Sequence, residues 1–97
     1  MPGIARDDAM LAMRIDKFLW YARLAGSRSA AQKLAEAGTL RLDGRRVDRA
    51  HALVRPGSVL AFVQGDGVRV LQVVALPGRR GPAAEAAALF ADAAHRS

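Results

Sequence analysis

The sequence has 97 residues, enough for one small domain, and its 15 Lys and Arg residues against 9 Asp and Glu residues give a formal net charge of +6. It contains no cysteine, which excludes a disulfide framework and a thiolate zinc site. No segment has the roughly 20 apolar residues that a membrane-spanning helix needs, and the N-terminus lacks the pattern of a signal peptide. We therefore expect a cytoplasmic protein without a membrane partner.

The chain divides by its patterns into three parts. Residues 1–12 show no useful periodicity, so we expect them to form a flexible N-terminal extension. Residues 13–76 carry the helical and strand patterns of the domain. Residues 77–97 are expected to form a basic connector and a C-terminal helix.

The first helical pattern follows Arg14. Asp16 is the predicted N-cap, because its carboxylate can accept hydrogen bonds from the free N–H groups of the first turn, and Gly26 is expected to break the helix. The apolar positions recur with helical spacing and predict one buried stripe, formed by Ile15, Phe18, Leu19 and Ala22.

A second helix is predicted directly after the first. Ser27 is its expected N-cap, and Gly38 is expected to end it in a left-handed conformation. At about 100° per residue, one arc of this helix holds the small and apolar side chains Ala30, Ala31, Leu34, Ala35 and Ala37.

After the second helix the period changes to that of a strand. Residues 39–43 alternate, with Leu40 and Leu42 on one side. Asp43-Gly44 is a strong signal for a two-residue hairpin turn. The unit is therefore predicted to be helix, turn, helix, hairpin.

Two longer strands and a last helix complete the predicted fold. Residues 58–64 are nearly continuous in apolar side chains and predict a well-covered strand, with residues 68–75 as its antiparallel partner. Pro82 suits the start of a helix over residues 83–94. The side chains expected to pack are Ala50, Leu53 and Val54 in the middle of the chain and Ala86, Leu89 and Phe90 in the last helix. The predicted class is α+β: the two-helix-plus-hairpin unit on a small, twisted, mainly antiparallel sheet.

The positive charge is concentrated in the two helices and the hairpin. From residue 14 to residue 49 we count nine basic and four acidic side chains, an excess of +5 in a chain of net charge +6. A charge excess gathered in one structural unit favours a polyanionic partner such as RNA over a merely solvated surface.

The sequence offers little for catalysis. His51 and His95 are the only histidines, they lack the spacing of metal ligands, and no cysteine could complete a zinc site. We expect no catalytic residues, metal, cofactor or small-molecule substrate. Two roles stay open for Trp20 and Tyr21: stacking on a splayed base, or packing against the C-terminal helix, which is favoured in so aromatic-poor a chain.

Five segments carry a family resemblance: Arg14-Ile-Asp-Lys-Phe-Leu-Trp20, Ala22-Arg23 before the turn, Ser27-Arg-Ser-Ala-Ala31, Ala37-Gly-Thr-Leu-Arg-Leu-Asp-Gly-Arg-Arg-Val47 and the late Arg80-Gly-Pro-Ala-Ala-Glu-Ala86. Their order and spacing resemble the S-four (S4) RNA-binding domain, named after ribosomal small-subunit protein four. Within that group the chain is most similar to the stand-alone heat-shock protein 15 family of bacteria. A basic residue usual in the turn between the helices is replaced here by Gly26.

The resemblance implies an α+β fold and non-catalytic binding of structured ribosomal RNA. For the closer family it implies a stress-response role on large ribosomal subunits that are stalled with a nascent chain and transfer RNA. The two alternatives are a detached RNA-specificity subunit of an RNA-modifying enzyme and a DNA-binding helix-turn-helix protein. A monomer is expected. The residues predicted to contact RNA are Arg14, Lys17, Arg23, Arg28, Ser29, Lys33, Arg41, Arg45, Arg46 and Arg49.

Overall fold

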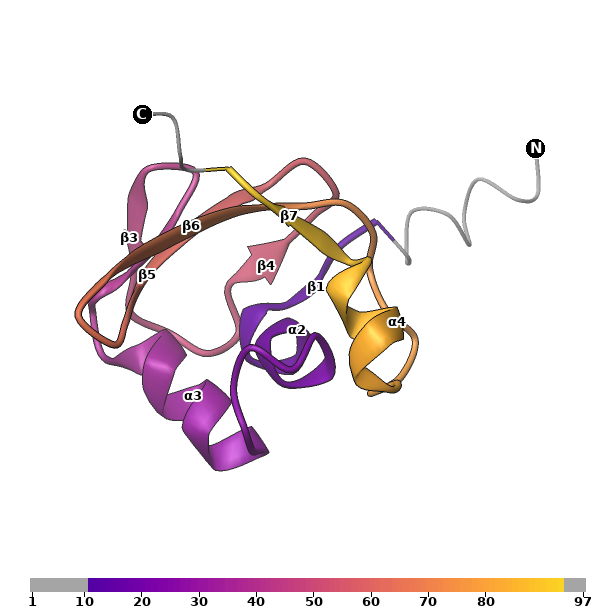
Figure 1. Ribbon diagram of the computed structural model, residues 1–97. Coiled ribbons are helices and arrows are strands. Elements are labelled where there is room, and N and C mark those ends of the chain that lie inside the picture. Colours follow the sequence, from indigo (N-terminus) through magenta and orange to yellow (C-terminus); the bar gives the residue numbers. More distant parts are fainter. Residues whose placement is uncertain (1–10, 94–97) are drawn as a thin grey trace.

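The computed structural model describes residues 11–93, which fold into helices packed on an antiparallel sheet (Figure 1). In chain order the elements are β1 (Met13–Arg14), α2 (Ile15–Tyr21), α3 (Arg28–Glu36), β2 (Leu40–Leu42), β3 (Arg45–Val47), β4 (Leu53–Val54), β5 (Val59–Gln64), β6 (Gly67–Val73), α4 (Ala83–Ala87) and β7 (Phe90–Asp92). Almost all of the expected extension, and the end of the expected last helix, lie outside the described residues.

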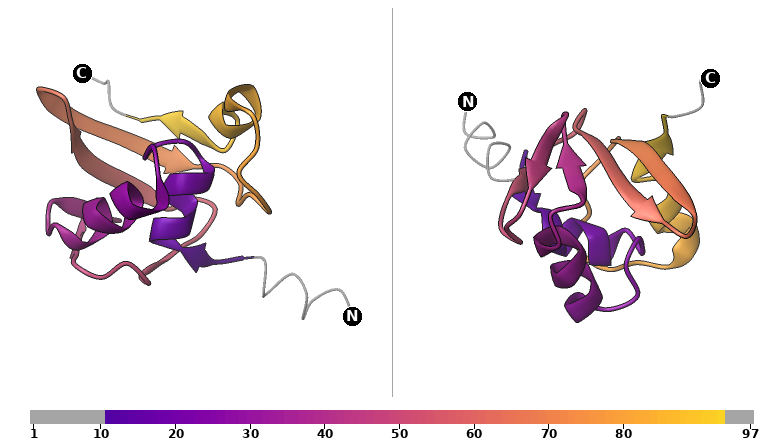
Figure 2. Two further views of the ribbon diagram at one scale, coloured as in Figure 1. Left: turned by 90° about the horizontal axis from the view of Figure 1, so that it is seen from below. Right: turned by 90° about the vertical axis from the view of Figure 1, so that its left-hand side faces the viewer.

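The sheet has five strands in the order β3-β2-β5-β6-β7, and every neighbouring pair is antiparallel. Helices α2 and α3 cover one face of this sheet, and α4 lies near β7 (Figures 1 and 2). The first hairpin and the two later strands thus form one sheet, and the α+β prediction is confirmed.

The core lies between this sheet and the two helices. Leu60 of β5 pairs with Leu42 of β2 on one side and with Leu71 of β6 on the other. Leu60 and Leu71 are fully buried, and so are Ile15, Phe18 and Leu19 of α2. Only alternate residues of β5 point into the core, so Val63 is 53% exposed. The strand is therefore less well covered than predicted, because the helices pack on one face of the sheet only.

The buried stripe of α2 is confirmed, but both ends of the helix differ from the prediction. Arg14 is the N-cap and makes no capping hydrogen bond through its side chain, while Asp16 lies within the first turn. The helix starts early because the Ile15 N–H donates to the Ala52 carbonyl, at 2.7 Å, as β1 ends. At the other end the left-handed residue is Arg23, with φ 62°, so α2 stops before Gly26.

Helix α3 begins as predicted. The Ser27 hydroxyl accepts a hydrogen bond from the Ala30 N–H at 3.1 Å, and Gly38 follows the helix with φ +83°. The buried arc is narrower than expected, since Ala31 and Ala35 are buried whereas Ala30 and Ala37 are exposed. Two small residues one turn apart suffice for the close contact with α2, so the helix keeps a wide exposed face.

The sequence did not predict the two-stranded pairing at the start of the domain: β1 pairs antiparallel with β4, with Met13 opposite Val54 and Arg14 opposite Leu53. Two-residue strands carry no detectable alternation. Ala50 and Val54 are buried as expected, but Leu53 is 47% exposed, so the prediction that it packs in the core was wrong.

The last helix is much shorter than predicted. Helix α4 ends at Ala87, and Phe90–Asp92 forms strand β7 on the edge of β6, with Phe90 opposite Val73. The Val74 N–H also donates to the Leu89 carbonyl at 2.7 Å. Alanine is the best helix former, but helix propensity is a small preference per residue, whereas the edge of β6 gains hydrogen bonds from a partner strand. Tertiary pairing therefore overrides the local preference.

Candidate nucleic-acid interface

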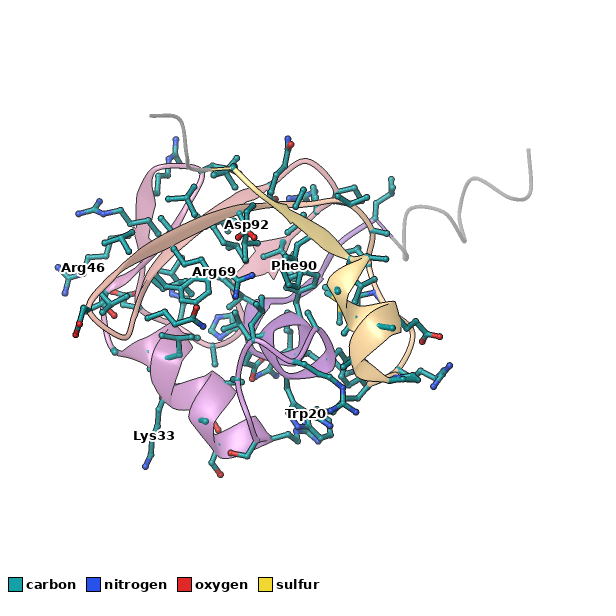
Figure 3. All side chains as sticks on the ribbon, in the orientation of Figure 1. Trp20, Lys33, Arg46, Arg69, Phe90 and Asp92 are labelled. Carbon is teal, nitrogen blue, oxygen red and sulfur yellow. The ribbon has the colours of Figure 1, made fainter. Side chains whose placement is uncertain are left out.

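The exposed face of α3 carries three of the residues predicted to contact RNA. Arg28, Ser29 and Lys33 are all exposed, and Lys33 points away from the body of the protein (Figure 3). Ser29 and Lys33 are one helical turn apart and so lie on the same side of the helix. Because only a narrow arc of α3 is buried, this side of the helix is accessible to a ligand.

The hairpin presents its arginines on both faces. Arg41 of β2 and Arg46 of β3 are directly opposite each other, whereas Arg45 is opposite Leu42. Side chains of a cross-strand pair stand on the same face, so two guanidinium groups share the face away from Leu42. Like charges in this arrangement destabilise a hairpin unless an anion lies between them.

Arg46 also connects the hairpin to the end of α3. A Cβ atom built on Gly38 would lie 2.8 Å from a terminal nitrogen (Nη2) of Arg46, so the guanidinium occupies space that only glycine leaves free at residue 38. The carbonyl end of a helix favours a positive charge. The Arg46 guanidinium therefore lies beside the end of α3, although its backbone belongs to the hairpin.

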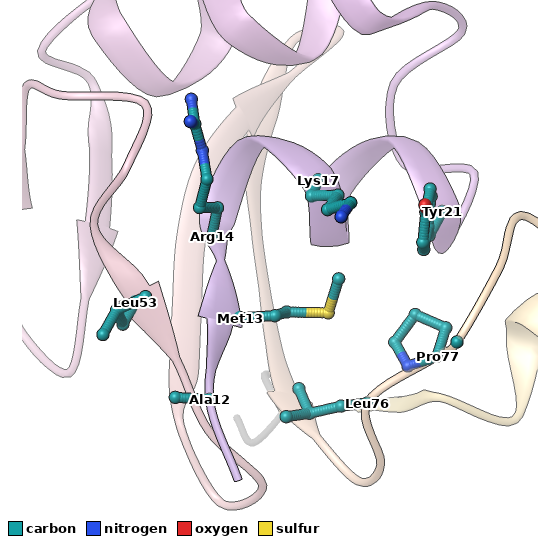
Figure 4. A pocket seen from close by; sticks show the side chains of 9 residues that line it. Ala12, Met13, Arg14, Lys17, Tyr21, Leu53, Leu76 and Pro77 are labelled. Atoms are coloured by element: carbon teal, nitrogen blue, oxygen red, sulfur yellow. The ribbon is translucent and has the colours of Figure 1, made fainter. Parts of the chain in front are cut away.

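A cavity of about 410 Å³ lies beside the start of α2 (Figure 4). Lys17 and Tyr21 form one wall, and the Lys17 ammonium is 5.7 Å from the centre of the Tyr21 ring. Apolar side chains line the rest, including Met13, Leu76 and Pro77. Arg14 borders the cavity, but its guanidinium makes a double hydrogen bond with Asp16 at 3.0 and 2.9 Å.

The turn after α2 is tied to the connector before α4. The Arg23 Nε donates to the Gly81 carbonyl at 2.7 Å, and the Arg80 Nε donates to the Trp20 carbonyl at 3.1 Å. The guanidinium groups of Arg28 and Arg80 lie 5.5 and 5.6 Å from the centre of the Trp20 ring. Trp20 thus contacts Arg80 of the connector, a cation outside residues 14–49, where the positive charge was expected to concentrate.

Carboxylate partners separate the cations into two groups. Arg69 pairs with Asp92 and Arg79 pairs with Glu85, each at 3.0 Å, and both arginines lie in the later part of the chain. Among the predicted contact residues, Arg14 pairs with Asp16, and Arg49 lies 3.9 Å from Asp48. Within residues 11–93 no carboxylate pairs with the other seven cations of the predicted set, namely Lys17, Arg23, Arg28, Lys33, Arg41, Arg45 and Arg46.

Other kinds of site are sparse in the part of the chain that the structure describes. No three His, Cys, Asp or Glu side chains come together there in a way that could hold a metal ion. His51 is exposed. No helix over residues 11–93 is long and apolar enough to cross a membrane.

Comparison with known proteins finds similarity to S4 domains and to proteins named heat shock protein 15. The sequence pattern of the S4 domain matches residues 13–60. Heat shock protein 15 of Escherichia coli is 32% identical over 89 residues, which cover 92% of this chain and 66% of the relative. The small ribosomal subunit protein uS4 of an Exiguobacterium species is 40% identical over 63 residues, or 63% of this chain and 32% of that protein.

A solved structure shares the fold. The trimeric structure of Vibrio cholerae heat shock protein 15 superimposes with a TM-score of 0.79 at 29% sequence identity, covering 86% of this chain and 83% of that one. The chain spans just under two thirds of the length of the Escherichia coli relative, and 59% of the length of the Haemophilus influenzae homologue.

Proposed function

The chain belongs to the S4 domain family of RNA-binding modules, and we propose that it uses α2, α3 and the β2–β3 hairpin to bind a folded segment of ribosomal RNA. The observation that carries the proposal is that seven of the nine cations predicted to contact RNA have no carboxylate partner among the described residues. Unpaired cations on a small protein repel one another, and RNA phosphates would remove that repulsion.

The shape of this surface supports folded RNA as the ligand. Cations project from two helices and from both faces of the hairpin, so they do not lie along one straight line. A bent path of phosphates, as at a junction between RNA helices, matches such a surface better than one strand of a regular duplex. In this proposal Arg and Lys side chains neutralise phosphates, and Ser29 donates or accepts one hydrogen bond.

The action that we propose is binding without catalysis. Arg28, Lys33, Arg41 and Arg46 would position the protein on the RNA by contacts with the phosphate backbone. We place this binding on the large ribosomal subunit in the cytoplasm, in rescue or recycling of subunits that hold a nascent chain and transfer RNA. The similarity to heat shock protein 15 supports that choice.

Crosslinking tests the proposal directly. The full chain is crosslinked separately to purified large and small bacterial ribosomal subunits, and the crosslinked nucleotides are mapped. We expect sites confined to one folded region of large-subunit RNA, together with loss of those crosslinks when Arg41 and Arg46 are both replaced by Ala. Crosslinks scattered over both subunits, or unchanged in the double variant, would contradict a specific site.

We propose further that the chain binds as a monomer. The cations of the contact surface come from one chain and lie on consecutive elements. Since the Vibrio cholerae relative is described as trimeric, light scattering of the free protein and of its RNA complex decides the matter. A stable trimer at the concentrations used for titration would contradict the monomer.

A further inference from the structure

Two arginines that are far apart in sequence meet at the chain's one tryptophan. Arg28 begins α3, and Arg80 belongs to the connector before α4, yet both guanidinium groups lie beside the Trp20 ring, at 5.5 and 5.6 Å from its centre. Trp20 lies at the edge of the protein, below α2 and towards the connector (Figure 3). The S4 pattern covers residues 13–60, so it includes Trp20 and Arg28 but not Arg80.

Backbone contacts hold Arg80 in this place. Its Nε donates to the Trp20 carbonyl at 3.1 Å, and the next residue, Gly81, accepts from the Arg23 Nε at 2.7 Å. A guanidinium that donates through Nε alone keeps its terminal amino groups for a ligand. The terminal amino groups of the neighbouring Arg79 are not free in this way, because one of them forms an ion pair with a Glu85 carboxylate oxygen at 3.0 Å.

No carboxylate among the described residues compensates the charges of this pair of arginines. Contact with the indole ring stabilises each cation modestly, but two positive charges beside one ring repel each other. Within residues 11–93 neither Arg28 nor Arg80 has a carboxylate partner. An anion that accepts hydrogen bonds from both planar groups would replace repulsion by attraction.

We infer that Arg28, Trp20 and Arg80 form a binding site for backbone phosphates of the RNA. The inference rests on the proposed function and extends its surface beyond the S4 pattern, from α3 to the connector. Arg80 binds phosphate through its terminal amino groups, while Trp20 and its carbonyl keep the guanidinium oriented. The connector is therefore part of the RNA-binding surface as well as a link to α4.

The test compares Arg80→Gln with Arg79→Gln in the full chain, using ribosomal RNA extracted from bacterial large subunits as the probe. Both variants remove one positive charge from adjacent residues, but only Arg80 lies at Trp20. We expect Arg80→Gln to weaken binding roughly tenfold and to reduce the steepness of the salt dependence by about 0.7–0.9 in log–log units, the value for one phosphate. Arg79→Gln should leave both quantities nearly unchanged. Equal effects of the two variants would overturn the inference.

Trp20 supplies an independent readout, because its fluorescence comes from this site alone. We expect its emission to change on addition of the RNA and to saturate together with binding. Binding without any change in emission would overturn the site even if Arg80→Gln proved too unstable to measure. Arg80→Lys keeps the charge and loses the planar fork, so it should recover only part of the affinity; full recovery would contradict a site built on guanidinium geometry.

Failure of the inference and failure of the proposed function are distinguishable. If the unaltered chain does not bind ribosomal RNA, the proposed function is wrong. If it binds, and Lys33→Ala weakens binding while Arg80→Gln does not, the function stands and the extension to the connector is wrong.

Discussion

Gly38 and Arg46 are fitted to each other: the guanidinium of Arg46 fills the space beside Gly38 in which any other residue would place its Cβ, 2.8 Å from a terminal nitrogen. Gly38 also has φ +83°, a conformation that L-residues with a side chain rarely adopt. The end of α3 and the second strand of the hairpin therefore approach each other at this residue pair.

Gly38→Ala should destabilise the protein and weaken RNA binding. A left-handed conformation costs alanine about 1–2 kcal/mol, and the new methyl group would displace Arg46. Gly26→Ala is the matched control, because a Cβ at Gly26 meets nothing within 4 Å and its φ is not positive; that change should be neutral or slightly stabilising. Thermal melting and RNA titration of both variants check this. Equal melting temperatures for the two variants would contradict the strain argument.

Leu19→Ala should lower the free energy of unfolding by about 2–5 kcal/mol, since the side chain is fully buried and its removal leaves a cavity. Val63→Ala is the control, because Val63 is 53% exposed on the sheet face away from the helices. Denaturant unfolding measures both. A loss for Leu19→Ala no larger than that for Val63→Ala would show that the helix face is misassigned.

Arg28→Ala should lower affinity for ribosomal RNA by about 1–3 kcal/mol, the range for a charged hydrogen bond. Stability should fall by only about 0.5–1 kcal/mol, for the lost contact with Trp20. Arg69→Ala should change affinity much less, but Arg69 pairs with Asp92 and contacts Phe90, so its removal also disturbs β7.

Arg55→Ala provides a cleaner comparison for Arg28→Ala. Arg55 is exposed, precedes the Pro56-Gly57 turn and has no carboxylate partner among residues 11–93. Titrations at one fixed salt concentration should therefore show a loss for Arg28→Ala alone. Equal losses for the two variants would mean that binding depends on total charge, and the assignment of the contact surface would have to be withdrawn.

Binding should weaken steeply with salt. If about four or five phosphates are engaged, log affinity should fall against log salt with a slope of roughly −3 to −4.5. Titrations of ribosomal RNA at a series of potassium chloride concentrations give this slope. A slope close to zero would mean that apolar contacts dominate and that the unpaired cations have another role.

Folded RNA should bind more tightly than duplex DNA of the same length, because cations on two helices and both faces of a hairpin follow a bent path. A competition assay with both nucleic acids at one salt concentration measures the difference. Equal or tighter binding of the DNA would favour the helix-turn-helix alternative, with α3 as the helix that enters the major groove.

Local patterns in the sequence were sufficient to predict many elements of this fold. The stripe of Phe18 and Leu19, the Ser27 cap and the Asp43-Gly44 turn each depend on residues within a few positions of one another, so spacing alone reveals them. In the structure Asp43 has φ 52° and Gly44 has φ 84°, as a turn of this type requires. The excess of positive charge over residues 14–49 was likewise visible, because these elements are consecutive in the chain.

Tertiary structure decided what depends on distant partners. Phe90–Asp92 became a strand because β6 offers an unpaired edge, although its own sequence follows a run that favours helix. The fold was also needed to tell which cations are available to RNA. Arg69 and Arg79 form ion pairs with carboxylates, whereas Arg80 donates to the carbonyl of Trp20, 60 residues earlier in the chain. Composition determines how many charges a protein has, but only packing determines which of them are already neutralised and which remain available to a ligand.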